Sequence, residues 1–246
     1  MNYRDRLKRA AEIVLQSKRV FALTGAGIST ESGIPDYRSP GTGLWNKTNP
    51  FKTASVSALR KDPAEFYKTT ITQWREFSNA QPNVGHNTMK VLEDKGRILG
   101  IITQNIDGLH HKAGSNSVLE VHGHLRTARC VKCEGRVPFD KVIEQLDKGI
   151  NPPRCSLCDG YLRPDVVLFE DAMSDDFIKA TKVLSGCDLL LVVGTSLQVY
   201  PVATLPQLAR RLIIINKMPT SYDNKAAVIF HESIGKVLSD LEKTLE

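Results

Sequence analysis

Short, continuous apolar runs recur along the chain and predict the strands of a buried sheet. Within each run, apolar residues do not alternate with polar ones, so both faces of each strand should be covered. This pattern is typical of a parallel sheet between two layers of helices. The runs are residues 19–24, 98–103, 118–121, 188–193, 212–215 and 227–230.

Helical periodicity appears before, between and after these runs. In residues 3–17, apolar side chains recur at helical spacing opposite Arg and Lys, which predicts an amphipathic surface helix. Further helical patterns cover about 84–95, 174–185 and 233–245. Alternating strands and helices predict an α/β fold with a doubly wound, Rossmann-like parallel sheet.

Two stretches, residues 36–80 and 125–161, interrupt this alternation and are interpreted as insertions. The first begins as a Pro/Gly-rich loop. It then predicts a helix in which Asp62 caps the first turn, Pro63 occupies it and Glu65 completes a capping box. Phe66, Trp74 and Phe77 would form the apolar side of that helix. The predicted division is a Rossmann-like domain of residues 1–35, 81–124 and 162–246, a cofactor loop and helical insertion of 36–80, and a zinc-binding module of 125–161.

Composition bears on the cellular compartment of the protein and on contact with membranes or nucleic acid. The 246 residues have 41% hydrophobic content and a formal net charge of +6. The longest purely apolar run, residues 189–193, is too short to span a bilayer, and the start lacks the apolar core of a signal peptide. A cytoplasmic protein without membrane contact is therefore expected. We interpret the basic excess as solvated surface, so direct nucleic-acid binding is not expected.

Four of the five cysteines form two close pairs that predict a metal site. Cys130 and Cys133 are two residues apart, as are Cys155 and Cys158, and 21 residues separate the pairs. Four thiolates at this spacing are typical of a structural zinc ion, with no position open for a catalytic water. A redox dithiol and an iron–sulfur centre are the alternatives. Cys187 lies in an apolar run and is interpreted as a core residue.

A glycine-rich turn, Gly25-Ala26-Gly27, follows the first predicted strand and could let a dinucleotide phosphate approach the backbone. However, Thr30 stands where a dehydrogenase fingerprint has its third glycine. No acidic ribose ligand follows about 20 residues later. The pattern therefore argues against hydride transfer.

Polar residues also follow several other predicted strands. They are Gln104 to His110, His122 with Gly123, Gly194-Thr195-Ser196 and Asn216. Open α/β sheets bind ligands at the carboxyl ends of their strands. Each cluster alone could serve a turn, but together they predict one ligand site.

The combined motifs resemble the sirtuin family of NAD-dependent protein deacylases, of prokaryotic type, over essentially the whole chain. The resemblance rests on Gly25-Ala-Gly-Ile-Ser-Thr30, Gly33-Ile-Pro-Asp-Tyr-Arg38, Thr103-Gln-Asn-Ile-Asp107, Glu120-Val-His-Gly123, the four cysteines and Gly194-Thr-Ser196, in that order. It implies a cleft that binds NAD and an acetyl-lysine protein or peptide. It also implies a deacetylase that consumes NAD and releases nicotinamide, O-acetyl-ADP-ribose and free lysine.

The resemblance implies roles for individual residues. Of the six histidines, His122 would be the catalytic base, with Asn105 as a second catalytic residue, and His86 would be structural. The implied NAD-binding residues are Gly25, Ala26, Gly27, Ser29, Ile34, Tyr37, Arg38, Gln104, Asn105, Ile106, Asp107, Gly194, Thr195, Ser196 and Asn216. The implied substrate-binding residues are Tyr37, Val167, Leu168, Phe169 and Tyr200.

Three residues and one short segment depart from the family pattern. Tyr37 replaces the usual Phe, and Glu170 replaces a usual Gly, which would put a charge at the edge of the peptide cleft. The segment 208–212 looks shortened and lacks a Gly at the helix end, which could shift Asn216. Thr70 stands where relatives specialised for acidic acyl groups have Arg, with Tyr67 three residues before it, so neutral acyl groups are expected.

Two other functions are compatible with these motifs. One is a mono-ADP-ribosyltransferase that uses the same cofactor chemistry. The other is a DNA-binding zinc-ribbon protein regulated by NAD. The sequence carries no signal for substrate identity or oligomeric state.

Overall fold

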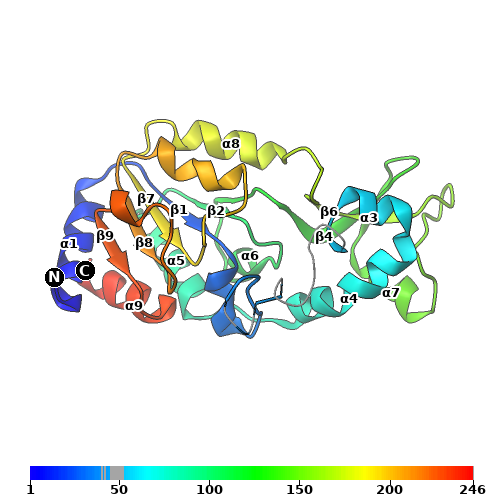
Figure 1. Cartoon of the computed structure of the whole chain (residues 1–246), viewed down its shortest axis with the longest axis horizontal. Coiled ribbons are helices and arrows are strands. Elements are labelled where there is room, and N and C mark those ends of the chain that lie inside the picture. The colour runs from blue at the N-terminus through cyan, green and yellow to red at the C-terminus, as the bar shows by residue number, and fades with distance from the viewer. Residues whose placement is uncertain (40, 42, 45–52, 246) are drawn as a thin grey trace.

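A six-stranded parallel sheet forms the centre of the larger part of the molecule (Figure 1). The structure, a computed structural model, describes residues 1–39, 41, 43–44 and 53–245. The strand order is β3-β2-β1-β7-β8-β9, so the direction of strand addition reverses between β1 and β7. The strands are β1 (Val20–Thr24), β2 (Ile101–Thr103), β3 (Val118–Glu120), β7 (Leu189–Val193), β8 (Leu212–Ile215) and β9 (Val228–Phe230). All six predicted strands are confirmed, several of them shorter than predicted.

Helices cover both faces of this sheet, as the continuous apolar runs predict. Alternate strand residues serve opposite faces: Val20 and Ala22 pack in one core, and Phe21 and Leu23 pack in the other. The first core is covered by α1 (Tyr3–Gln16), α5 (Val84–Asp94) and α9 (Ile234–Thr244). The second is covered by α8 (Asp175–Leu184) and the 3₁₀ helix η3 (Val202–Leu208), near the top of Figure 1. Cys187 is fully buried in the second core, as predicted.

The two predicted insertions pack against each other around a second centre, at the right of Figure 1. The rings of Trp74 and Phe139 meet edge to face with centroids 5.8 Å apart. The Tyr67 hydroxyl donates a hydrogen bond to the Leu162 carbonyl oxygen over 2.9 Å. The elements here are α3 (Val56–Lys61), α4 (Pro63–Asn79), α7 (Asp140–Asp147) and an antiparallel sheet of β5 (Arg136–Pro138), β4 (Gly123–Cys130) and β6 (Leu162–Val166).

Three further short helices connect elements of the larger part of the molecule. They are η1 (Ala26–Ser32), α6 (Leu109–Lys112) and η4 (Asp223–Lys225). None of the helices in the described part of the chain is long and apolar enough to cross a membrane.

Helix starts follow local capping chemistry, with one correction to the sequence prediction. Asp62 caps α4 by accepting a hydrogen bond from the Glu65 amide, as predicted. The reciprocal half of the predicted capping box is wrong. The Asp62 amide instead donates to the Ala58 carbonyl of α3, and the Glu65 carboxylate lies beside Lys68. A full capping box occurs on α5, between Asn83 and His86, which gives His86 the structural role expected for it.

The segment 208–212 ends η3 without a glycine. Ala209 is extended and pairs with Cys187 in an isolated bridge, and the Arg210 amide donates to the Cys187 carbonyl. This pairing leads directly into β8, so the short connection delivers Asn216 to the sheet edge that carries the other polar residues.

The glycines after β1 and β7 are required because the two turns touch. The Gly27 amide donates to the Gly194 carbonyl over 2.8 Å. A Cβ on Gly25 would lie 2.8 Å from the Thr195 Cβ, and one on Gly27 would lie 2.8 Å from the Gly194 Cα. A Cβ on Gly194, whose φ is +63°, would lie 2.4 Å from the Ile28 amide nitrogen. Close packing between the two turns is thus a reason for these glycines that the sequence does not reveal.

This contact predicts that Gly194→Ala destabilises the protein more than Gly186→Ala does. Both positions have a left-handed backbone, but a Cβ on Gly186 would meet no atom within 4 Å. Both variants lose about 1–2 kcal/mol from backbone strain, and Gly194→Ala loses about 1–3 kcal/mol more from the clash. Urea unfolding measures the difference, and equal losses would contradict the packing role.

Candidate active site and metal centre

A large cleft opens at the carboxyl ends of β1, β2, β7 and β8, where the strand order reverses. Its volume is about 1500 Å³, and it extends to α4 and to the segment after β6. The site residues expected from the sequence that line it are Gly25, Ala26, Gly27, Ile34, Tyr37, Arg38, Gln104, Asn105, Ile106, His122, Val167, Leu168, Phe169, Gly194, Thr195, Ser196, Tyr200 and Asn216. Ser29 and Asp107 are not among the lining residues.

Ser29 and Asp107 instead support the cleft wall through Asn105. The Asn105 Nδ2 donates to the Ser29 Oγ over 3.0 Å and to the Gly25 carbonyl over 3.2 Å. The Ser29 hydroxyl donates to Asp107 Oδ2 over 2.7 Å, and the Leu109 amide donates to Oδ1 over 2.9 Å. With Nδ2 engaged twice, the Asn105 carbonyl oxygen is the polar end left for a ligand. Burial raises the pKa of Asp107, although the two hydrogen bonds act in the opposite direction.

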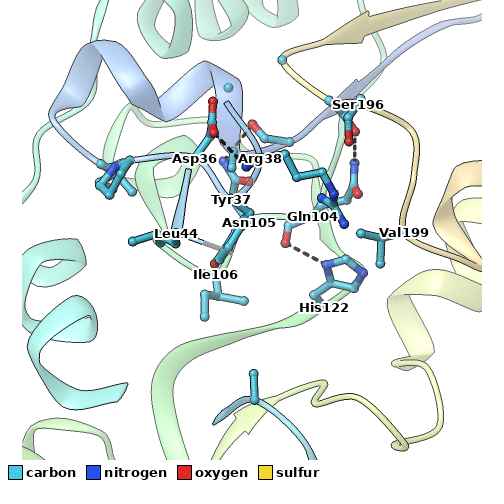
Figure 2. A pocket seen from close by; sticks show the side chains of 18 of the residues that line it. Asp36, Tyr37, Arg38, Leu44, Gln104, Asn105, Ile106, His122, Ser196 and Val199 are labelled. Carbon is cyan, nitrogen blue, oxygen red and sulfur yellow. Dashed lines mark hydrogen bonds between the residues drawn. The ribbon is translucent and has the colours of Figure 1, made fainter. Parts of the chain in front are cut away.

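His122 is held in one tautomer at the edge of the cleft (Figure 2). Its Nδ1 lies 3.0 Å from the Gln104 carbonyl oxygen. A carbonyl only accepts, so Nδ1 carries the hydrogen, and the unprotonated nitrogen is Nε2. Burial lowers the pKa of His122, against the smaller opposing effect of this hydrogen bond. The ring is therefore neutral at neutral pH and can accept a proton at Nε2.

The other histidines do not line the cleft. His86 and His110 are buried, with ring centroids 4.9 Å apart. His110 Nε2 lies 3.0 Å from the Thr24 hydroxyl, which donates in turn to Thr103 Oγ1. Burial lowers the pKa of His86 to about 4 and that of His110 well below its usual range. Sequence reasoning missed this network behind the site, because its only signal was two ordinary threonines at strand ends.

Gln104 connects His122 to the turn after β7. The Gln104 carbonyl accepts from His122, and its side-chain Nε2 donates to Thr195 Oγ1 over 2.9 Å. At the far end of the cleft, Asn216 Nδ2 donates to the Met218 carbonyl over 2.7 Å. The polar residues that follow β2, β3, β7 and β8 therefore line one cleft, as the sequence predicted.

The segment after η1 forms a tight turn around Asp36. Asp36 Oδ1 accepts from the amides of Arg38 and Ser39 over 3.0 and 2.7 Å. Tyr37 between them is partly buried, and desolvation of its hydroxyl raises the pKa to about 12 and keeps the hydroxyl protonated. Of the predicted cofactor loop, residues 40, 42 and 45–52 lie outside the described residues.

Comparisons with known proteins agree with this geometry. The model of the Sir2 family matches residues 25–201. The chain is 46% identical to "NAD-dependent protein deacetylase 2" of Caldanaerobacter subterraneus subsp. tengcongensis, over 98% of this chain and 96% of that protein. The chain belongs to the Sir2 family.

Solved structures of Sir2 enzymes also match over nearly the whole length. One, with a deacetylated p53 peptide and 3'-O-acetyl-ADP-ribose, has a TM-score of 0.92 and 33% identity, covering 96% of this chain and 97% of that one. Another, with a p53 peptide and NAD⁺, has a TM-score of 0.89 and 33% identity over the same shares. The Rossmann-like architecture expected from the sequence is thereby confirmed.

The segment after β6 of this Sir2 protein is fixed on both sides. The Val167 amide donates to the His122 carbonyl over 2.8 Å, which joins this segment to the candidate base. The Phe169 amide donates to the Ala54 carbonyl, and the Phe169 carbonyl accepts from the Val56 amide. The Asp171 carboxylate accepts from the Leu168 amide and pairs with Arg163 over 2.6 Å.

Glu170, which replaces a usual Gly, caps a helix. Its backbone has a φ of +76°, a conformation that normally favours glycine. Its carboxylate accepts hydrogen bonds from the Ser57 amide over 2.8 Å and the Ser57 hydroxyl over 2.9 Å, in the first turn of α3. The residue lies at the cleft edge as expected, but its charge is directed at the helix start, where it is favourable.

The four paired cysteines come together as a metal site. All four Sγ atoms lie within 4.8 Å of one another. Cys130 and Cys158 are 3.4 Å apart, and Cys133 and Cys155 are 3.7 Å apart. Tetrahedral zinc with Zn–S bonds of ~2.3 Å requires sulfurs roughly 3.8 Å apart, so the donor set and size fit zinc. A Cβ on Gly160 would lie 2.7 Å from the Cys130 sulfur, which explains a glycine there.

This site predicts one structural zinc per chain. Removing it by chelation, or disrupting the site with Cys155→Ser, should lower Tm by about 5–10 °C, because the ion organises β4, β5 and α7. Metal analysis and thermal unfolding measure both effects. Cys187→Ala, at the fifth cysteine, is the control and should keep its zinc. Full stability without zinc would contradict a structural role.

Proposed function

We propose that this chain is an NAD-dependent protein-lysine deacetylase. It consumes NAD and transfers the acetyl group to ADP-ribose, releasing nicotinamide, O-acetyl-ADP-ribose and the deacetylated lysine. The names of its relatives and the peptide and nucleotide in the matched Sir2 structures support this activity. The single observation that carries it is a neutral His122, in a fixed tautomer, at the cleft where the strand order reverses.

NAD, when bound, supplies a ribose carbon with nicotinamide as its leaving group. The turn after β1 and the turn after β7 would hold its phosphates. The amides of Gly25, Gly27 and Gly194 are bonded within the fold, so the remaining backbone N–H groups of the two turns would face the phosphates. Asn216, beside the Met218 carbonyl, occupies the adenosine-ribose end. The full proposed set is Gly25, Ala26, Gly27, Ser29, Ile34, Tyr37, Arg38, Gln104, Asn105, Ile106, Asp107, Gly194, Thr195, Ser196 and Asn216.

His122 serves as the general base. The Gln104 carbonyl holds the proton on Nδ1, so Nε2 takes a proton from a ribose hydroxyl. Burial keeps the ring neutral before the reaction. Asn105, fixed by Ser29 and Gly25, presents its carbonyl oxygen to the reacting end of the cleft.

The substrate lies along the segment after β6. Tyr37, Val167 and Phe169 form the channel for the aliphatic lysine stem, while Leu168 and Tyr200 flank the peptide backbone. Tyr200 is 75% exposed, although it is large and aromatic, and it lines the same cleft. Backbone pairing with an extended peptide gives affinity with little sequence selection.

Neutral acyl groups fit this cleft better than acidic ones. Tyr67 is buried and hydrogen-bonded to Leu162, and the Thr70 hydroxyl donates to the Phe66 carbonyl of its own helix. Among the described lining residues, no Lys or Arg comes from α4, whereas Glu76 does. An acidic acyl group would therefore meet no cation on that wall.

The domain division and location are part of the proposal. In the proposed division, residues 1–35, 81–124 and 162–246 form the NAD-binding domain, 36–80 the cofactor loop and helical insertion, and 125–161 the zinc module. The sheet of the zinc module takes one strand, β6 (Leu162–Val166), from the start of the last NAD-binding segment. We place the protein in the cytoplasm, because the thiols of all five cysteines are unbridged.

Loss of His122 tests the proposal. His122→Ala should reduce formation of O-acetyl-ADP-ribose from NAD and an acetyl-lysine peptide by about 100- to 10,000-fold. His124→Ala, at a histidine outside the cleft, is the matched control. Mass spectrometry of O-acetyl-ADP-ribose and of the deacetylated peptide measures the effect. Labelled ADP-ribose on protein with no free lysine would support a transferase instead.

The pH profile provides a second test. Since the pKa of His122 lies below its ordinary 6.5, the base is active above that pH and is lost as the pH falls through the lowered pKa. The acidic limb of kcat/KM should therefore have its midpoint below 6.5. A midpoint above 6.5 would contradict a buried neutral base.

A further inference from the structure

An ion pair crosses the stretch of chain that carries His122. The Arg126 guanidinium donates two hydrogen bonds to the Glu120 carboxylate, from Nη1 to Oε1 over 2.7 Å and from Nη2 to Oε2. The Glu120 side chain is 5% exposed and the Arg126 side chain 48% exposed. Since Glu120 precedes His122 and Arg126 follows it, the pair closes a short loop of chain around the candidate base.

The enclosed segment joins the two sheets of the molecule. β3 ends at Glu120 in the six-stranded sheet, and β4 begins at Gly123 in the three-stranded sheet. Val121 and His122 alone lie between the two strands, so His122 is part of the connection itself. The direction of its ring therefore depends on the angle at which β4 leaves the larger sheet.

The two ends of this connection are held unequally. The Glu120 amide donates to Asp176 Oδ2 over 3.0 Å, which fixes Glu120 to the start of α8. On the other side, the pairing of β4 with β6 shifts register between Gly123 and Ala128. Arg126 lies inside this irregular stretch, where strand pairing controls the direction of the chain less well. The ion pair thus links a fixed residue to the irregular start of β4.

Geometry is a stronger reason for this pair than stability. An ion pair with a buried partner gains little net free energy, because burial removes the hydration of the carboxylate. A bidentate contact between guanidinium and carboxylate instead fixes both distance and orientation, since its two hydrogen bonds form together. His111 Nε2 also lies 3.5 Å from Glu120 Oε1, but a single contact at this distance fixes no orientation.

We propose that Glu120 and Arg126 are positioning residues for the base. Their ion pair holds the connection between the sheets at one angle, and this angle sets the place of His122 Nε2 at the cleft. The Gln104 carbonyl fixes the tautomer, but one hydrogen bond to a carbonyl permits a broad range of ring directions. Neither Glu120 nor Arg126 lines the cleft, so each acts through His122.

This inference rests on the proposed deacetylase function, and two assays separate them. The first measures O-acetyl-ADP-ribose formed from NAD and an acetyl-lysine peptide, which requires the base. The second measures peptide-dependent exchange of labelled nicotinamide into NAD, because in the proposed reaction nicotinamide leaves before His122 takes the ribose proton. Residues that position the base alone affect the first assay and leave the second unchanged.

Arg126→Met removes the guanidinium and keeps an unbranched side chain. Since a displacement of about 1 Å at a reacting group costs about 100-fold, we expect O-acetyl-ADP-ribose formation to fall by about 10- to 100-fold. Nicotinamide exchange should stay within about twofold of wild type. Adding Arg126→Met to His122→Ala should cause no further loss, because no base remains to be positioned.

Two further variants control for folding. Arg126→Lys keeps a positive charge beside Glu120 without the parallel hydrogen bonds, so it should remain folded and lose the first activity in part. Arg129→Met is the matched control on β4, because Arg129 is 36% exposed and pairs with Asp165 of β6 within the smaller sheet. It should keep both activities, and thermal unfolding checks that each variant is folded.

Two results would overturn the inference. One is unchanged formation of O-acetyl-ADP-ribose in Arg126→Met. The other is an equal fall in both assays, which would assign the ion pair a structural role only. By contrast, wild-type enzyme that forms no O-acetyl-ADP-ribose would refute the proposed function itself.

Discussion

The contact between the turns after β1 and β7 is the constraint on which the site depends. The Gly27 amide bonds the Gly194 carbonyl, and neither turn has room for a side chain at Gly25, Gly27 or Gly194. The contact lies between β1 and β7, where the strand order reverses. It therefore sets the distance between the turns that follow the carboxyl ends of these two strands. The same glycines leave backbone exposed to the cleft.

Gln104 extends this constraint to the reacting groups. Its backbone amide bonds the Thr24 carbonyl, its side chain bonds Thr195, and its carbonyl fixes His122. One residue thus ties the end of β1, the turn after β7 and the candidate base into a single arrangement. The His122 carbonyl then holds Val167, so the peptide side of the cleft is positioned from the same point.

The sequence predicted the sheet and the zinc cluster, and all of its expected NAD- and substrate-site residues except Ser29 and Asp107 line the cleft, because each belongs to a local pattern or a motif. It could not predict what depends on contacts between distant segments. The reason for Gly194 lies in a turn far away in the chain, and Glu170 acts through Ser57. The predicted capping box at Asp62 is only half formed, because the Asp62 amide donates to the Ala58 carbonyl of α3 and not to Glu65.

The central claim is that NAD is consumed in step with deacylation in this cleft. The most direct measurement is the amount of nicotinamide released per lysine deacylated, with and without an acetyl-lysine peptide. The account predicts one nicotinamide per free lysine and negligible release without peptide. Steady nicotinamide release without peptide, retained in His122→Ala, would contradict it.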